Sequence, residues 1–208
     1  MLSRRIFAAC GLWIGVASIA LAAPAAPKPA KVFPDLNHNG RLDPYEDSRL
    51  PAETRARDLL ARMTLAEKAG LMLHGTAPTI RNSTGIEDSY DLAKAEQMVR
   101  DGHVTSMITR LAAAPEKMAA ENNRLQAIAR QTRLGIPITI SSDPRHHFYS
   151  FAGMSSSTNG FSQWPETLGF AALRDPALVR RFADIARQEY RATGIQMALS
   201  PQADIATE

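Results

Sequence analysis

The sequence predicts an α/β fold built around a parallel β-sheet. Short apolar runs rich in β-branched residues alternate with longer stretches of helical periodicity, an order typical of βαβ units. The two later runs, at 136–140 and 195–199, each lead to an aspartate close to a proline, Asp143 and Asp204. Because parallel strands end at the same edge of a sheet, we expect both carboxylates at that edge, where α/β proteins bind ligands.

Residues 1–22 have the pattern of a secretory signal peptide. Arg4 and Arg5 precede an uncharged apolar run over 6–22, and the small residues at its end fit a cleavage site. The alternative is a transmembrane anchor, but the run is short for a hydrocarbon core of ~30 Å. We therefore expect no stable membrane anchor and a periplasmic or extracellular location. Cys10, the only cysteine, lies in this segment, so the mature chain has neither disulfides nor a cysteine-based zinc site.

Charge and composition exclude some classes of partner. The chain is 45% hydrophobic and 22% charged, which is typical of a globular protein. Without residues 1–22 it carries 22 basic and 21 acidic side chains, so nothing indicates a nucleic-acid partner. Residues 23–34 begin with a Pro/Ala-rich stretch and are expected to form a linker. The sequence does not indicate an oligomeric state.

Residues 35–46 match the EF-hand calcium loop at every defined position. Gly40 would supply the sharp turn of such a loop, and oxygen ligands would come from Asp35, Asn37, Asn39, the carbonyl of Arg41, Asp43 and Glu46. No entering helix can end at Pro34, so a structural calcium ion is expected here rather than a calcium sensor. The alternative is a surface loop rich in Asx turns.

Helical periodicity and cap residues predict most of the helices. One region begins at Pro51, and a capping box from Thr64 to Glu67 opens the next helix. A loop is expected over 74–89. Further helices are expected over 92–100, from Pro115 to an end at Gly135, and from Pro176 to Gly194. Further strands are expected over 104–109, 136–140 and 195–199.

The run over 136–140 is the most informative strand because it leads to Asp143, the first candidate site residue. A cap on the turn before Pro144 is the alternative role for this aspartate. A long loop is expected over 144–163. In that loop, His146 and His147 would be contacts to a bound substrate, a surface pair or metal ligands, although no third metal ligand is evident.

The chain resembles the N-terminal domain of glycoside hydrolase family 3, the β-glucosidase-like enzymes. The resemblance rests on several stretches in the family's order, at 35–47, 59–70, 134–143, 163–172 and 189–205. It implies a (β/α)8 TIM-barrel-like domain, or a distorted version of one. It also implies hydrolysis of β-linked glucosides or related oligosaccharides with retention, by two carboxyl groups about 5 Å apart and without a catalytic cofactor.

The resemblance assigns roles to two residues. Asp143 matches the family's carboxylate that binds hydroxyls of the sugar in the reactive subsite, and His146 holds the position of the family's histidine. The glycine that commonly follows this histidine is replaced here by His147. Both Asp143 and His146 are therefore expected to bind substrate.

The resemblance places the nucleophile and the acid/base beyond Glu208. Residues 53–208 are accordingly expected to form the first part of a barrel domain, because a complete barrel takes about 250 residues. Two alternatives remain open at this point. One is a non-catalytic carbohydrate- or calcium-binding module, and the other is an enzyme that uses Asp143 and Asp204 as its acid pair.

Overall fold

The computed structural model describes residues 33–147 and 160–200. The predicted signal peptide over 1–22, nearly all of the predicted linker and Asp204 lie outside the described residues.

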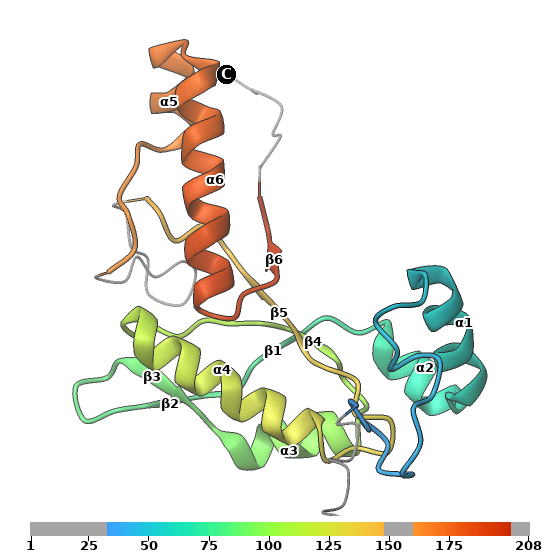
Figure 1. The fold of residues 1–208 in the computed structure, drawn as a ribbon. Helices are drawn as coiled ribbons and strands as arrows, with labels where there is room; N and C mark the ends of the chain where they lie inside the picture. Colours follow the sequence, from blue (N-terminus) through green and yellow to red (C-terminus); the bar gives the residue numbers. More distant parts are fainter. Residues whose placement is uncertain (1–32, 148–159, 201–208) are drawn as a thin grey trace, which may run out of the picture. The chain divides into compact units, whose positions relative to one another are not determined.

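Four short parallel strands form the main sheet (Figure 1). Their order is β1-β4-β5-β6, so along the chain each of these strands pairs with the next one of the set. This arrangement confirms the predicted α/β fold with a parallel sheet. The described strands do not close into a barrel. The strand bounds are β1 Gly75–Thr76, β4 Ser106–Ile108, β5 Thr139–Ser142 and β6 Met197–Ala198.

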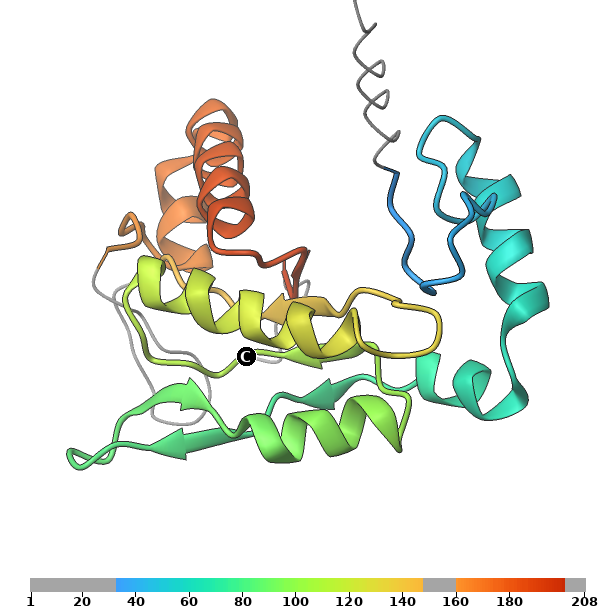
Figure 2. The same ribbon diagram turned by 60° about the horizontal axis from the view of Figure 1, so that its bottom comes forward.

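Helices connect the strands of this sheet as predicted. Helix α3 (Leu92–Arg100) precedes β4, α4 (Pro115–Ala129) precedes β5, and α6 (Pro176–Ala192) precedes β6. Helices α3 and α4 pack against each other (Figure 2). Asp175 caps α6 by accepting from the amides of its first turn, and Gly194, at φ +81°, follows its end.

Two helices precede the sheet, α1 (Ala52–Arg62) and α2 (Leu65–Leu71). The predicted capping box opens α2, with the Thr64 hydroxyl accepting from the amide of Glu67 and the Glu67 carboxylate accepting from the amide of Thr64.

One core lies between the sheet and its helices. Leu125 of α4 and Ile140 of β5 are fully buried in it, which explains why the periodic apolar positions form a helix face and a strand at these points. Other large apolar side chains that are fully buried in the described part of the chain are Met107, Leu111, Met118, Ile138 and Ile195.

The predicted loop over 74–89 is wrong, because this segment contains β1 and an antiparallel hairpin of β2 (Thr79–Arg81) and β3 (Glu87–Tyr90). The hairpin strands are short and polar and lack the alternation that marks a strand in a sequence. At the turn, the Asn82 side-chain oxygen accepts from the amides of Thr84 and Ile86.

Strand β5 begins at Thr139, later than the predicted start at residue 136. Gln126 of α4 accounts for the difference, because its side-chain amide accepts from Ile138 N and donates to Ile138 O. Pro137 also lacks an amide for the ladder. The helix α5 (Thr167–Leu173) was not predicted, and β6 is shorter than the predicted 195–199.

Gly135 explains how the chain passes from α4 to β5. It has φ +57°, and a Cβ atom there would lie 2.5 Å from the carbonyl oxygen of Leu36. The predicted helix end at Gly135 is wrong, because α4 ends at Ala129 and the amides of Gln131 and Thr132 form turn bonds to carbonyls three residues back. The Tyr45 hydroxyl donates to the Leu134 carbonyl next to Gly135. Glycine is therefore required both by the backbone angle and by the close contact with the 35–46 loop.

Candidate functional site

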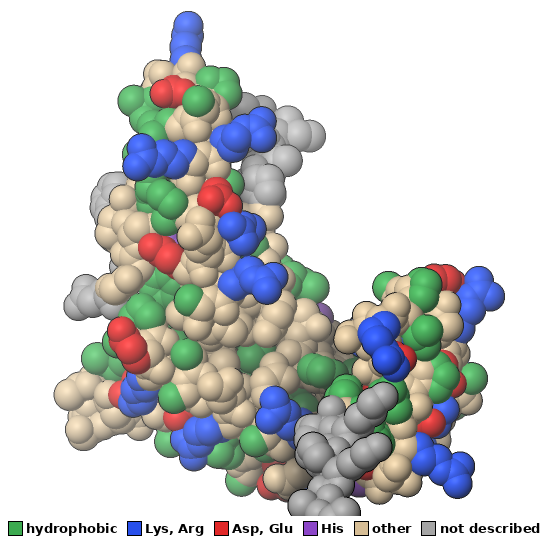
Figure 3. Space-filling model, in the orientation of Figure 1, with side chains coloured by type: hydrophobic (Ala, Val, Ile, Leu, Met, Phe, Trp, Pro, Cys, Tyr) green, Lys and Arg blue, Asp and Glu red, His purple; other side chains and the backbone are tan. Residues whose placement is uncertain are grey.

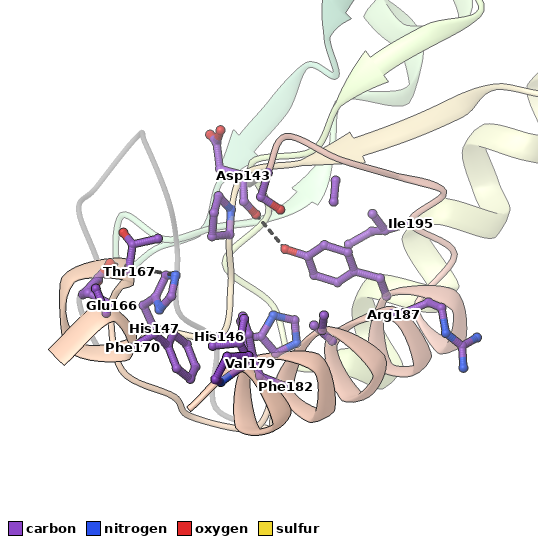
Figure 4. Close-up of a pocket in the computed structure, with 18 of the residues that line it drawn as sticks. Asp143, His146, His147, Glu166, Thr167, Phe170, Val179, Phe182, Arg187 and Ile195 are labelled. Carbon is purple, nitrogen blue, oxygen red and sulfur yellow. Dashed lines mark hydrogen bonds and ion pairs between the residues drawn. The ribbon is translucent and has the colours of Figure 1, made fainter. Parts of the chain in front are cut away.

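Asp143 lies at the carboxyl end of β5, where the sequence placed it. Its Oδ2 is 3.2 Å from Nη1 of Arg110. Arg110 follows β4, the strand that pairs with β5. The Asp143 and Arg110 side chains are 32% and 30% exposed, so both are only partly buried. Figure 4 shows the Asp143 carboxylate turned away from α6. A carboxylate and a guanidinium are thus placed side by side at this edge.

The backbone of Asp143 is held separately from its side chain. The Tyr190 hydroxyl of α6 donates to the Asp143 carbonyl at 2.9 Å, the bond dashed in Figure 4, and the Ser142 hydroxyl donates to the same oxygen at 2.8 Å. Burial raises the pKa of Tyr190, so the phenol remains a hydrogen-bond donor at neutral pH. Two donors therefore fix the point from which the carboxylate projects.

Arg145 is buried directly behind this edge, with 2% of its surface exposed. Its guanidinium donates to the Ser142 hydroxyl, to Leu111 O and to Thr109 O, at 2.6, 2.7 and 3.0 Å. Burial lowers the pKa of Arg145, although an arginine still keeps its charge at physiological pH.

His146 is buried, 2% exposed, and its Nε2 is 2.7 Å from Oε2 of Glu189. Its ring lies among aromatic side chains, with ring centroids 5.0 Å from Tyr190 and 5.4 Å from Phe161. Burial lowers the pKa of His146 and outweighs the opposite influence of Glu189, so the contact is a hydrogen bond from a neutral ring. The predicted sugar contact of His146 stays a prediction. In this structure the side chain links the segment after Asp143 to α6.

Glu189 joins the same segment to the chain before α5. Besides His146, its carboxylate accepts from the amide and the hydroxyl of Ser162. The Ser162 hydroxyl in turn accepts from the Trp164 indole at 2.8 Å, and Trp164 N donates to His146 O at 2.7 Å. These bonds tie two ends of the predicted 144–163 loop together on the helix side of Asp143.

A hollow of about 1610 Å³ opens between the segment after β5 and the helices α5 and α6. It is lined by apolar side chains such as Phe170, Val179 and Phe182, which Figure 4 shows on the helix side. Figure 3 shows hydrophobic side chains between basic and acidic ones on one face of the molecule. Asp143 and Arg110 are also among the residues that line this hollow.

His147 lines the hollow, with Nε2 at 3.8 Å from Oε2 of Glu166. Its Nδ1 atom is buried and has no hydrogen-bond partner in the described part of the chain. Nothing in residues 33–147 and 160–200 brings three His, Cys, Asp or Glu side chains together as a metal site. The metal-ligand alternative for the two histidines therefore finds no partner residues there.

The 35–46 loop is held by its own hydrogen bonds. Asp35 accepts from the amides of Asn39 and Gly40, and the Asn37 and Asn39 side-chain amides both donate to Oδ2 of Asp43 at 2.7 Å. The Glu46 carboxylate accepts from the amides of residues 36, 37 and 43, and the other Asp43 oxygen accepts from Arg62.

This bonding tests how well the loop fits a calcium ion. Amide N–H groups of Asn37 and Asn39 occupy the place where a cation needs oxygens, so calcium would require both amides to turn over. The six predicted positions are close enough in sequence to supply oxygens. Calcium binding stays a prediction that rests on the sequence motif.

The chain folds as an α/β domain with a carboxylate and a guanidinium at the carboxyl ends of its parallel strands. Such domains bind ligands at this position. Residues 64–208 match the model of the Glycosyl hydrolase family 3 N terminal domain. The chain belongs to this family.

Curated relatives agree with this assignment. The chain is 62% identical over 177 residues to the "Periplasmic beta-glucosidase/beta-xylosidase" of Dickeya chrysanthemi, covering 85% of this chain and 27% of the relative. It is 44% identical over 180 residues to "Beta-glucosidase C" of Emericella nidulans, covering 84% and 28%. A "Probable beta-glucosidase C" of Aspergillus oryzae is 42% identical over 169 residues, covering 79% and 26%. The chain thus spans less than a third of the length of these relatives.

No helix in the described ranges is both long and apolar enough to cross a bilayer.

Sequence reasoning found Asp143 and missed three residues beside it. Arg110 follows β4, so the strand-end rule that selected Asp143 would also have selected it. Helical periodicity places Tyr190 on the apolar side of α6, and periodicity does not reveal where a hydroxyl points. Arg145 gave no signal, because nothing in a sequence marks an arginine as buried.

Proposed function

We propose that this chain supplies part of the sugar-binding site of an exported glycoside hydrolase of the β-glucosidase type. The protein would hydrolyse β-linked glucosides or related oligosaccharides with retention of configuration. Support comes from membership of family 3 and from relatives whose names contain beta-glucosidase, one of which is also named periplasmic. The basic and apolar pattern of residues 1–22 supports export.

The observation that carries the proposal is the pair of Asp143 and Arg110 at the carboxyl edge of the sheet. Each sugar hydroxyl can donate one hydrogen bond and accept others. A carboxylate accepts from such hydroxyls, a guanidinium donates to their oxygens, and bonds to charged groups are the stronger ones. Neighbouring hydroxyls of one sugar ring can therefore be held by the two side chains together.

In this proposal Asp143 binds and orients the sugar and takes part in no covalent step. A retaining mechanism requires a nucleophile and an acid/base. We assign neither role to a described residue. A sugar held by Asp143 and Arg110 would present its reacting carbon at a constant position. Contacts that strengthen in the transition state would raise the rate.

Kinetics of the full-length protein test this function. Replacing Asp143→Ala should reduce kcat/KM for an aryl β-glucoside at least about 100-fold, or about 2.7 kcal/mol of transition-state stabilisation. Asp184→Ala is the matched control, because that aspartate lies on α6 and bonds only to Arg187 and Gln188 among the described residues. A loss under about threefold at Asp143 would remove it from the sugar site, and no glycosidase activity in the parent protein would refute the proposed function.

We also propose that a structural Ca²⁺ ion binds the loop over 35–46. The proposal is supported by the match to the EF-hand pattern and by the contact that places Leu36 against Gly135, so a stiffer loop would steady the turn that leads into β5.

A further inference from the structure

Arg145 makes hydrogen bonds to the two segments that carry the charged pair. Thr109 and Leu111 flank Arg110 on either side, and the Arg145 guanidinium donates to the carbonyl oxygens of both. Its Nε donates to the hydroxyl of Ser142, the residue immediately before Asp143. One buried side chain therefore touches the backbone around Arg110 and the residue next to Asp143.

We propose that Arg145 is a positioning residue that holds Arg110 and Asp143 beside each other at the carboxyl edge of the sheet. The expected effect of Arg145 on kcat/KM rests on the proposed function, while its expected effect on the Arg110–Asp143 contact does not.

The chemistry of arginine suits this task. A guanidinium is planar and carries five N–H donors in a fixed fork, so it can meet three acceptors at once without further adjustment. A lysine ammonium at this position would be a single point on a flexible stem. It could not reach the Thr109 and Leu111 carbonyls and the Ser142 hydroxyl with the same geometry.

The burial of Arg145 also argues against a role in stability alone. Moving a guanidinium out of water is costly, and a well-packed apolar side chain often stabilises a buried site as well or better. The Arg110–Asp143 pair itself is about one-third exposed, and such ion pairs contribute little to hold their own geometry. A rigid support behind the pair is therefore what fixes the spacing of the two charges.

The test compares Arg145→Lys with a matched control in the full-length protein. Gln126→Leu removes two side-chain bonds to the backbone of Ile138, at the opposite end of β5 from Asp143. Arg145→Lys should lower kcat/KM for an aryl β-glucoside on the order of 100-fold, as expected when a binding group is displaced by about 1 Å. Gln126→Leu should lower thermal stability and leave kcat/KM within about threefold.

A double-mutant comparison separates positioning from general damage. If Arg145 acts through Asp143, then Arg145→Lys in an Asp143→Ala background should change kcat/KM by less than about threefold. The same fractional loss in both backgrounds would overturn the proposal, because a merely less stable enzyme would lose activity regardless of Asp143.

Crystal structures of the variants provide a second test that does not depend on glycosidase activity. In Arg145→Lys the contact between Arg110 Nη1 and Asp143 Oδ2 should be lost, and in Gln126→Leu it should be kept. Retention of that contact in Arg145→Lys overturns the proposal even if the parent protein cleaves no glycoside, an outcome that would refute the proposed function separately. If Arg145→Lys does not fold, Ser142→Ala decides in its place, with an expected loss of about threefold to tenfold and the same displaced contact.

Discussion

The hydrogen bond from Tyr190 to the carbonyl of Asp143 offers the most direct test of how the edge is built. Tyr190→Phe removes the hydroxyl, whose oxygen lies 2.9 Å from that carbonyl, and keeps the ring. The ring should stay in place, because it packs against His146 and Phe161 with ring centroids 5.0 and 6.3 Å away. The substitution therefore isolates one hydrogen bond.

The loss of stability in Tyr190→Phe depends on which hydrogen bonds the Asp143 carbonyl keeps. The Ser142 hydroxyl still donates to the Asp143 oxygen at 2.8 Å, so no acceptor is left without a partner. The loss is then that of one neutral hydrogen bond, about 1 kcal/mol, rather than the larger penalty of an orphaned buried group. For a domain of 150–250 residues this lowers Tm by about 2–4 °C. If the bond also fixes Asp143 in the transition state, kcat/KM falls by up to about fivefold.

Tyr45→Phe is the matched control in the same assays of the full-length protein. Tyr45 is also buried, 5% exposed, and its hydroxyl donates to a backbone carbonyl, that of Leu134, at 3.2 Å. Thermal unfolding should show at least as large a loss of stability for Tyr45→Phe, because no second donor to the Leu134 carbonyl is found among the described residues, but only Tyr190→Phe should lose kcat/KM. Equal changes of kcat/KM in the two variants would refute the reasoning, as would a Tm loss far above that of the control.

Two further predictions concern acidity and calcium. Burial lowers the pKa of His146 below 6.5, so below that pH the unfolded chain binds more protons than the folded one. The free energy of unfolding should therefore keep its full value above pH 6.5 and fall as the pH drops below it. His146→Gln should flatten this decline between pH 7 and 5 in denaturant titrations. An unchanged slope in this variant would show that another group is responsible. Carboxylates such as Asp47, whose pKa is lowered to about 2 chiefly by its hydrogen bonds with Arg49, act in a separate window below about pH 4. Calcium should raise Tm by an amount equivalent to about 2.7 kcal/mol at 100 times Kd, with reversal by a chelator. Glu46→Gln should lower Tm without calcium, since its carboxylate accepts from three amides, and should also abolish the calcium shift; equal melting with and without calcium in the parent protein would rule out the ion.

The elements that the sequence predicted well are those whose signals are local. Asp175, Pro176 and Gly194 mark the two ends of α6, and Thr64 and Glu67 mark the start of α2, because caps act within one turn of the helix. The hairpin of β2 and β3 had no such signal. Its strands are stabilised by a turn and by cross-strand pairs such as Arg81 with Glu87, which become visible only once the register is known.

The same distinction separates Asp143 from the residues that hold it. A carboxylate at the end of a predicted strand can be found from the order of residues alone, since chain direction decides which edge it reaches. The positions of the residues that hold Asp143 depend on contacts between distant parts of the chain. Arg145 donates to carbonyls 34 and 36 positions earlier, and Tyr190 donates to a carbonyl 47 positions earlier. These contacts exist only because β4 and β5 are neighbours and α6 packs behind them. A substitution at Arg145 should therefore disturb sugar binding although its side chain is buried behind the edge. That consequence could not be derived from the sequence without the strand pairing.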